Sequence, residues 1–293
     1  MDTAQVLTGL PQSRFTQAAV RFVLGFLFFL AIVVAFAFMV LPVVAIFTHV
    51  SPGTLLDQLS NPVVTDALIV SFKTTVIAQA LILLFGTPTA YLLASRRFSG
   101  RTALVTLIEL PLVLPPAVAG LGLLVAFGRN GLLGSTLRTM GIEIPFTQTA
   151  VVLAVTFVAS PLYVRQAIAA FEAVDPNVVA ASRTLGAGST RTFARIILPL
   201  ARGGLAAGFA LALARGLGEF GATIMFAGSL QGVTQTLPLA IYSEFDVNFN
   251  AALAMGGLLI VVSAALLLTL KLGVLWQGSR RSSRYRSGLL SWS

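Results

Sequence analysis

The amino-acid sequence predicts an all-α membrane protein with about six transmembrane helices. Apolar residues make up 57% of its 293 residues and charged residues only 10%, and the mean hydropathy is +0.93. A soluble domain would carry roughly a quarter charged residues. The 26 glycines also suit helices that pack closely in lipid, where small residues let backbones approach one another.

The apolar stretches are long enough to cross a bilayer, since a span needs about 20 residues. The first stretch, 22–48, is uncharged and exceeds the apolar core of a signal peptide, so we expect a retained helix. Residues 1–60 then form an N-terminal segment with the first transmembrane helix, 61–276 the main transmembrane domain, and 277–293 a basic cytoplasmic tail. The six expected spans are 22–48, 64–95, 103–128, 147–171, 200–226 and 250–276.

The basic residues predict the orientation, because Lys and Arg favour cytoplasmic loops. Segments 49–63 and 227–249 contain neither residue, and 129–146 contains only Arg129 and Arg138. Both termini are therefore expected in the cytoplasm of a multi-pass protein of the plasma (inner) membrane, with the tail anchored near anionic lipid headgroups. The remaining loops and ends hold Arg14, Arg21, Arg96, Arg97, Arg101, Arg183, Arg191, Arg195, Arg202, Arg280, Arg281, Arg284 and Arg286.

Several functional classes are excluded. With no cysteine and a single histidine, His49, the chain offers no disulfide framework and no thiolate or histidine-rich metal site. No P-loop, His-Glu-x-x-His or Gly-x-Ser-x-Gly motif occurs, so we expect neither an enzyme active site nor a cofactor in this chain. The net charge of +9 is scattered between apolar runs, whereas a nucleic-acid-binding protein needs a basic face on a folded module.

The loop 172–199 interrupts the apolar pattern and reads as two short helices joined by a turn. Asp175 suits an N-cap and Pro176 the first helical position. Gly186 stands where a residue with positive φ would end the first helix. Ser189 can cap the second helix, and Pro199 is expected to close it where the chain re-enters the membrane. Val178, Ala181 and Leu185 share one helical face.

From Ala180 this loop reads Ala-Ala-Ser-x-x-x-Gly, followed by Ile196-x-Leu198-Pro199. It resembles the cytoplasmic coupling loop of ABC-importer permeases, with its Glu-Ala-Ala-x-x-x-Gly and Ile-x-Leu-Pro, although Ala180 replaces the family's Glu and Ser182 its second Ala. Capping alone is equally typical of an amphipathic loop without a partner, but the motif in this context favours the coupling loop. The resemblance implies that the loop binds an ATPase through a small-residue face and the turn, with Ala180, Ala181, Ser182, Gly186, Ile196, Leu198 and Pro199 as the coupling residues.

A proline-rich segment in the third span, Leu-Pro-Leu-Val-Leu-Pro-Pro at 110–116, is similar to one in molybdate and sulfate permeases. Pro115 and Pro116 remove two backbone donors and must bend or break a helix. Freed carbonyls are tolerated in lipid only against protein or a water-filled cavity, so the bend should face the bundle interior. A simple packing kink and a wall of a transport pathway both remain open.

The fifth span carries Gly-Glu-Phe-Gly-Ala-Thr at 218–223, followed by Thr-Gln-Thr-Leu-Pro at 234–238, which is similar to the molybdate/tungstate branch of the same permeases. Arg215 and Glu219 are spaced i, i+4, so they are expected to share a helical face and neutralise each other. A structural ion pair and a gate both remain open. The candidate pathway or gate residues are Pro115, Pro116, Arg215, Glu219, Thr223 and Ser229.

The resemblance implies a type I ABC-importer permease that works as a homodimer with two cytoplasmic ATPase subunits, which bind ATP and Mg, and an extracytoplasmic oxyanion-binding protein. It implies molybdate or tungstate as cargo, with sulfate as the alternative. A secondary transporter or channel working alone is the competing class. That class needs ion-coupling carboxylates or repeated broken helices, and few carboxylates lie in or near the spans, Glu109 and Glu219 among them. The sequence leaves the roles of Lys73 and Arg165 open.

Overall fold

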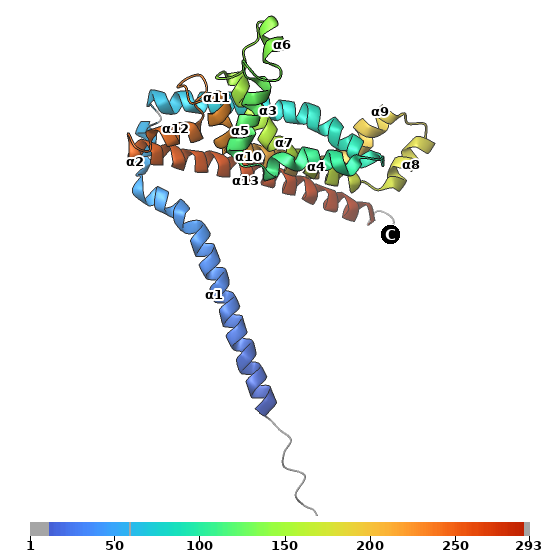
Figure 1. Cartoon of the computed structure of the whole chain (residues 1–293). Helices are drawn as coiled ribbons and strands as arrows, with labels where there is room; N and C mark the ends of the chain where they lie inside the picture. The colour runs from blue at the N-terminus through green and yellow to red at the C-terminus, as the bar shows by residue number, and fades with distance from the viewer. Residues whose placement is uncertain (1–11, 59, 290–293) are drawn as a thin grey trace, which may run out of the picture. The chain divides into compact units, whose positions relative to one another are not determined.

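The computed structural model describes residues 12–58 and 60–289, and the chain divides into two compact units between Ser51 and Pro52. The first unit contains α1 (Gln12–His49), whose apolar part, Val20–His49, is long enough to cross a membrane. This helix matches the first expected span. The second unit contains every other described helix (Figure 1).

Three long helices form the centre of the second unit. After the short α2 (Pro52–Gln58), α3 (Pro62–Ser95) begins where the side chain of Asn61 accepts a hydrogen bond from the Val63 N–H at 3.0 Å. It packs on α7 (Gln148–Glu172), which packs in turn on α10 (Leu198–Leu217), as Figure 1 shows. Small side chains, including Ala78, Ala90, Ala159 and Ala167, are buried between these helices, as expected for close packing in lipid.

The third expected span is two helices rather than one. α4 (Arg101–Val113) and α5 (Pro116–Phe127) are bent by 114° at the break between them. Leu114 and Pro115 are extended, with ψ near 133°, because a residue before proline is driven out of the helical region. The expected bend is therefore present, and it is sharp enough to redirect the chain.

The fifth expected span is also broken. α10 ends at Leu217, and the short α11 (Gly221–Ala227) follows after three non-helical residues. α11 packs on α5, and a Cβ added at Gly120 of α5 would lie 2.5 Å from the Ala222 carbonyl oxygen. The absence of a side chain at Gly120 is therefore a condition for this contact.

The remaining helices of the second unit are α6 (Gly134–Thr139), α8 (Pro176–Thr184), α9 (Ser189–Thr192), α12 (Leu237–Glu244) and α13 (Phe249–Leu289). α12 packs on α13, and its Leu237 N–H donates to Ser71 Oγ of α3 at 2.7 Å. The segment expected as a separate tail, 277–293, continues α13 as far as Leu289, and 290–293 lie outside the described residues. Within the described chain five helices are long and apolar enough to cross a membrane, or six if α4 and α5 form one span.

Candidate functional site

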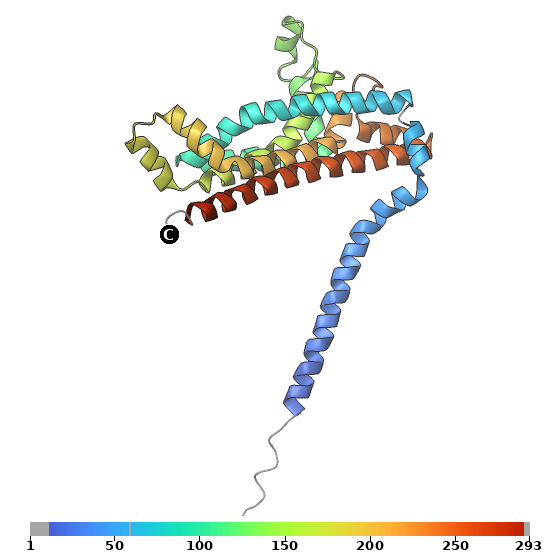
Figure 2. The same ribbon diagram turned by 180° about the vertical axis from the view of Figure 1, so that it is seen from behind.

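The loop 172–199 forms a helical hairpin, α8 and α9, which extends beyond the end of α3 and the start of α4 (Figures 1 and 2). Asp175 caps α8, because its Oδ1 accepts from the Asn177 N–H at 2.8 Å. Gly186 has φ +80°, so the predicted positive φ is confirmed. The Gly186 N–H donates to the Arg183 carbonyl at 2.9 Å and the Ala187 N–H to that of Ser182 at 3.0 Å. These two bonds form a Schellman motif, which ends the helix.

The outer surface of α8 differs from the expected small-residue face. Ala180 and Ala181 are exposed, but Ser182 is buried, with its Oγ 3.1 Å from Thr192 Oγ1 of α9. Ser182 therefore holds the hairpin together and is not part of the exposed face. Two large apolar side chains are exposed here: Leu185, directly after α8, is 87% exposed, and Val178 is 42% exposed.

The return into the bundle also differs from expectation. The N-cap of α9 is Gly188, and Ser189 is already helical and makes no capping bond with its side chain. Pro199 does not close a helix, since it lies at the start of α10 in a helical run that is continuous from Ser189 to Leu217. One π-helical turn, Phe193–Ile197, precedes it. This wider turn accommodates a proline that cannot donate to the carbonyl four residues back.

At the break between α10 and α11, Arg215 and Glu219 form an ion pair with 2.6 Å between Nη1 and Oε2. The pairing is as expected, but its geometry is not, because Glu219 lies beyond the end of α10 and the two residues do not share a helical face. Its other oxygen, Oε1, accepts from the Ala222 N–H at 2.7 Å at the start of α11. The Glu219 side chain is only 1% exposed. Glu219 therefore ties the two helices together.

The two helix breaks meet, since a Cβ added at Gly221 would lie 2.6 Å from Cβ of Pro116. Pro115 and Pro116 nevertheless remain exposed on this chain, so the expectation that the bend faces the interior is wrong for the single subunit. The buried residues of α5 are Ala119, Gly120 and Leu123, and α5 packs on α11 and α7. The break is therefore a surface feature of one copy.

The other two candidate residues lie on or beyond α11. Thr223 is fully buried, and its Oγ1 has no hydrogen-bond partner among the described residues. Ser229 follows α11 and accepts from Gln235 Nε2 at 3.3 Å. The structure thus groups Arg215, Glu219 and Thr223 around one break and places Ser229 at the far end of α11.

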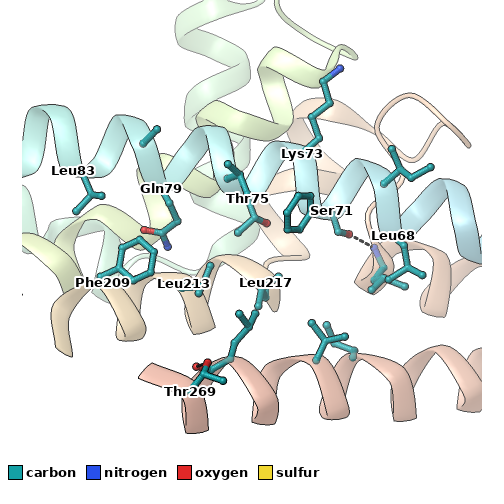
Figure 3. Close-up of a pocket in the computed structure, with 18 residues that line it drawn as sticks. Leu68, Ser71, Lys73, Thr75, Gln79, Leu83, Phe209, Leu213, Leu217 and Thr269 are labelled. Atoms are coloured by element: carbon teal, nitrogen blue, oxygen red, sulfur yellow. Dashed lines mark hydrogen bonds between the residues drawn. The ribbon is translucent and has the colours of Figure 1, made fainter. Parts of the chain in front are cut away.

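Sequence reasoning missed a polar stripe on α3. Ser71, Thr75 and Gln79, spaced four apart, line a cavity of about 820 Å³ between α3, α10, α12 and α13. In Figure 3 Gln79 points from α3 toward Phe209, and neither of its buried amide atoms has a partner among the described residues. The spacing of four was the available signal. The lining also includes Lys73 and Thr269, and its other residues are apolar. Because the Lys73 amino group points away from Gln79 and Phe209 in Figure 3, the described part of the cavity offers no positive charge to an anion.

Two further ion pairs, also missed, join α7 and α4: Arg101 with Glu172 at the ends of the two helices, and Arg165 with Glu109 further in. Arg165 Nε lies 3.6 Å from Glu109 Oε1, with side chains that are 71% and 35% exposed. The sequence offered no signal for this pair, since the two residues are far apart along the chain and belong to different helices.

Comparison with known proteins finds one family. The family model described as "Binding-protein-dependent transport system inner membrane component" matches residues 82–278. The molybdenum transport system permease protein ModB of Mycobacterium tuberculosis is 44% identical over 242 residues, which cover 82% of this chain and 91% of that protein. The sulfate transport system permease protein CysW of Synechococcus elongatus is 38% identical over 191 residues, which cover 64% of this chain and 67% of that protein.

Solved structures agree on the fold. A crystal structure of a bacterial ABC transporter involved in the import of the acidic polysaccharide alginate covers 89% of this chain and 98% of its own matched chain, with a TM-score of 0.64. At 17% identity, this similarity bears on the fold alone.

Proposed function

The chain belongs to the family of binding-protein-dependent transport system inner membrane components, and on that premise we propose that it forms the transmembrane pathway for molybdate or tungstate in an ATP-driven importer. It is a membrane transport subunit and not an enzyme. The observation that carries the cargo assignment is the 44% identity to a molybdenum permease over most of both chains. Sulfate is the second candidate, because a sulfate permease matches a shorter part of the chain at 38% identity.

The proposed assembly is a homodimer with the pathway between its two copies, both termini in the cytoplasm, two ATPase subunits and an extracytoplasmic binding protein. ATP and Mg bind in the ATPase subunits. The exposed apolar face of α8, with Leu185 at its end, supports docking of the hairpin in a groove of the ATPase. The departure at Ala180 leaves that face without the carboxylate typical of the family.

The helical run from Ser189 to Leu217 supports a mechanical coupling route. Its 29 residues extend for about 40 Å at 1.5 Å per residue, from the hairpin to the break that holds Glu219. If the ATPase displaces the hairpin, the whole helical run from Ser189 to Leu217 would move with it and shift the junction between α10 and α11. Regular helical hydrogen bonding stops at the break between α10 and α11, so α10 can turn there relative to α11.

Uptake competition tests the cargo assignment. Vesicles with the full complex and its binding protein should accumulate labelled molybdate, and unlabelled tungstate should compete better than sulfate. If sulfate competes with the labelled molybdate and tungstate does not, the cargo assignment changes from molybdate to sulfate. Uptake driven by an ion gradient without ATP would contradict the importer assignment.

A substitution at Gly186 tests the hairpin. Gly186→Val should cost about 1–2 kcal/mol, since the native φ is +80°, and should displace the turn. We expect normal insertion but joint loss of ATPase association and uptake, whereas Gly186→Asn should keep more of both because Asn tolerates positive φ. Gly188→Val is the matched control, with an ordinary φ of −65° and no atom within 4 Å of an added Cβ. A Gly186→Val protein that binds its ATPase and transports normally would remove the coupling assignment.

A further inference from the structure

The Arg165–Glu109 pair lies inside the membrane-spanning part of the chain. Arg165 is seven residues before the end of α7 at Glu172, and Glu109 is eight residues after the start of α4 at Arg101. At 1.5 Å per residue both are about 10–12 Å from those helix ends. The two charged groups are therefore level with each other and well inside the ends of their helices.

The guanidinium of Arg165 is nearly free. A separation of 3.6 Å from Glu109 is too long for a hydrogen bond, and no described residue accepts a hydrogen bond from Arg165. On α7 the exposed residues near it, Ala169 and Glu172, continue the same stripe. α4 has no buried residue at all. In one copy of the chain, this charge projects from an uncovered face.

Such a face cannot point into lipid. Ionisable residues in spans face the bundle interior or a water-filled cavity, because a charge in hydrocarbon is costly. Arg165 alone could extend toward the headgroups, but Glu109 lies at the same level on the neighbouring helix, and its short side chain cannot reach them. The face of α4 and α7 that carries both charges is therefore covered by water or by protein.

We propose that this face lines the aqueous pathway and that Arg165 binds the passing cargo, a tetrahedral oxyanion with two negative charges. Its planar guanidinium offers five N–H donors, a geometry that pairs with oxyanions through two parallel bonds. Glu109 acts as the resident counter-ion and gives way to the cargo, since its contact with Arg165 is long and not a hydrogen bond. This inference rests on the proposed oxyanion import, which tungstate and sulfate would share.

Water access tests the first half of the proposal. The chain contains no cysteine, so Arg165→Cys carries the only thiol of this subunit. In inside-out vesicles with the full complex, an anionic, membrane-impermeant thiosulfonate should modify it. Phe85→Cys, at an exposed apolar position of α3, should stay unmodified. Ser99→Cys, exposed in the turn between α3 and α4, should react and so verifies the orientation. An Arg165→Cys thiol as inert as that of Phe85→Cys would overturn the proposal.

Uptake by charge variants tests the second half. Arg165→Gln should lower the maximal molybdate uptake rate at least about tenfold, the factor expected for a lost charge-assisted hydrogen bond. Folded yield and ATPase association should stay normal. Arg165→Lys retains the charge and should recover most of the uptake, and Arg21→Gln on α1 controls for the loss of one positive charge. If the parent protein imports molybdate and Arg165→Gln matches it, this inference fails while the proposed function stands. Loss of uptake without reagent access would make Arg165 structural and would also overturn the inference.

Discussion

Two arginine–glutamate pairs of this chain, Arg215–Glu219 and Arg165–Glu109, are built differently. Arg215 and Glu219 approach to 2.6 Å, and the carboxylate is buried. Arg165 and Glu109 remain 3.6 Å apart, with the guanidinium 71% exposed. In the first pair the carboxylate also binds the Ala222 N–H, so it belongs to a joint between helices. In the second the charge stays available to a ligand.

The role of a charged residue in a transmembrane helix therefore depends on its burial and on the distance to its partner, and not on its residue type alone. Removing one partner of a buried pair leaves an uncompensated charge, which is strongly destabilising. Removing one partner of a loose, exposed pair costs little. The same substitution, glutamate to glutamine, should therefore destabilise the protein strongly at Glu219 and only slightly at Glu109, although both changes should affect transport.

The largest effect is expected at Glu219. Glu219→Gln should lower stability by about 3–5 kcal/mol, because Arg215 loses its partner. Folded yield, thermal stability in detergent and uptake should all fall. The double change with Arg215→Gln should recover part of each, since it removes the uncompensated charge. Strictly additive effects of the two single changes would show that the pair is not coupled.

A smaller effect is expected where α5 meets α11. Gly120→Ala should cost about 1–3 kcal/mol, because the new Cβ would lie 2.5 Å from the Ala222 carbonyl oxygen. Displacing α11 should also disturb its junction with Glu219. Gly122→Ala on the same helix is the matched control, because nothing lies within 4 Å of its added Cβ. Equal melting temperatures for the two variants would contradict the close α5–α11 contact.

Features decided by neighbouring residues could be predicted from the sequence. The Asp175 cap and the positive φ of Gly186 depend only on residues within one helical turn. The same holds for the apolar length of each span, so the fold class and most spans followed from composition. Pro115 signalled a break for the same local reason.

Features decided by contacts between distant segments could not be predicted. Glu219 left the helix because its carboxylate binds the start of α11, where Gly221 touches Pro116 of another span. Ser182 turned inward because Thr192 faces it across the hairpin. Arg165 acquired Glu109 only because α4 lies against α7. The i, i+4 spacing predicted the correct partner for Arg215, but for a wrong reason. It assumed one continuous helix, whereas α10 ends at Leu217, before Glu219.

The smallest effect on stability is expected at Glu109, and it sharpens the comparison. Glu109→Gln removes the same charge as Glu219→Gln, but from a pair that is 3.6 Å apart and partly exposed, so it should change stability by no more than about 1 kcal/mol. The melting temperature in detergent should stay close to that of the parent. The uptake rate should nevertheless fall, because a cargo-binding Arg165 that has lost its counter-ion would hold the oxyanion longer and release it more slowly. A destabilisation as large as that of Glu219→Gln would instead make Arg165 and Glu109 a second structural joint.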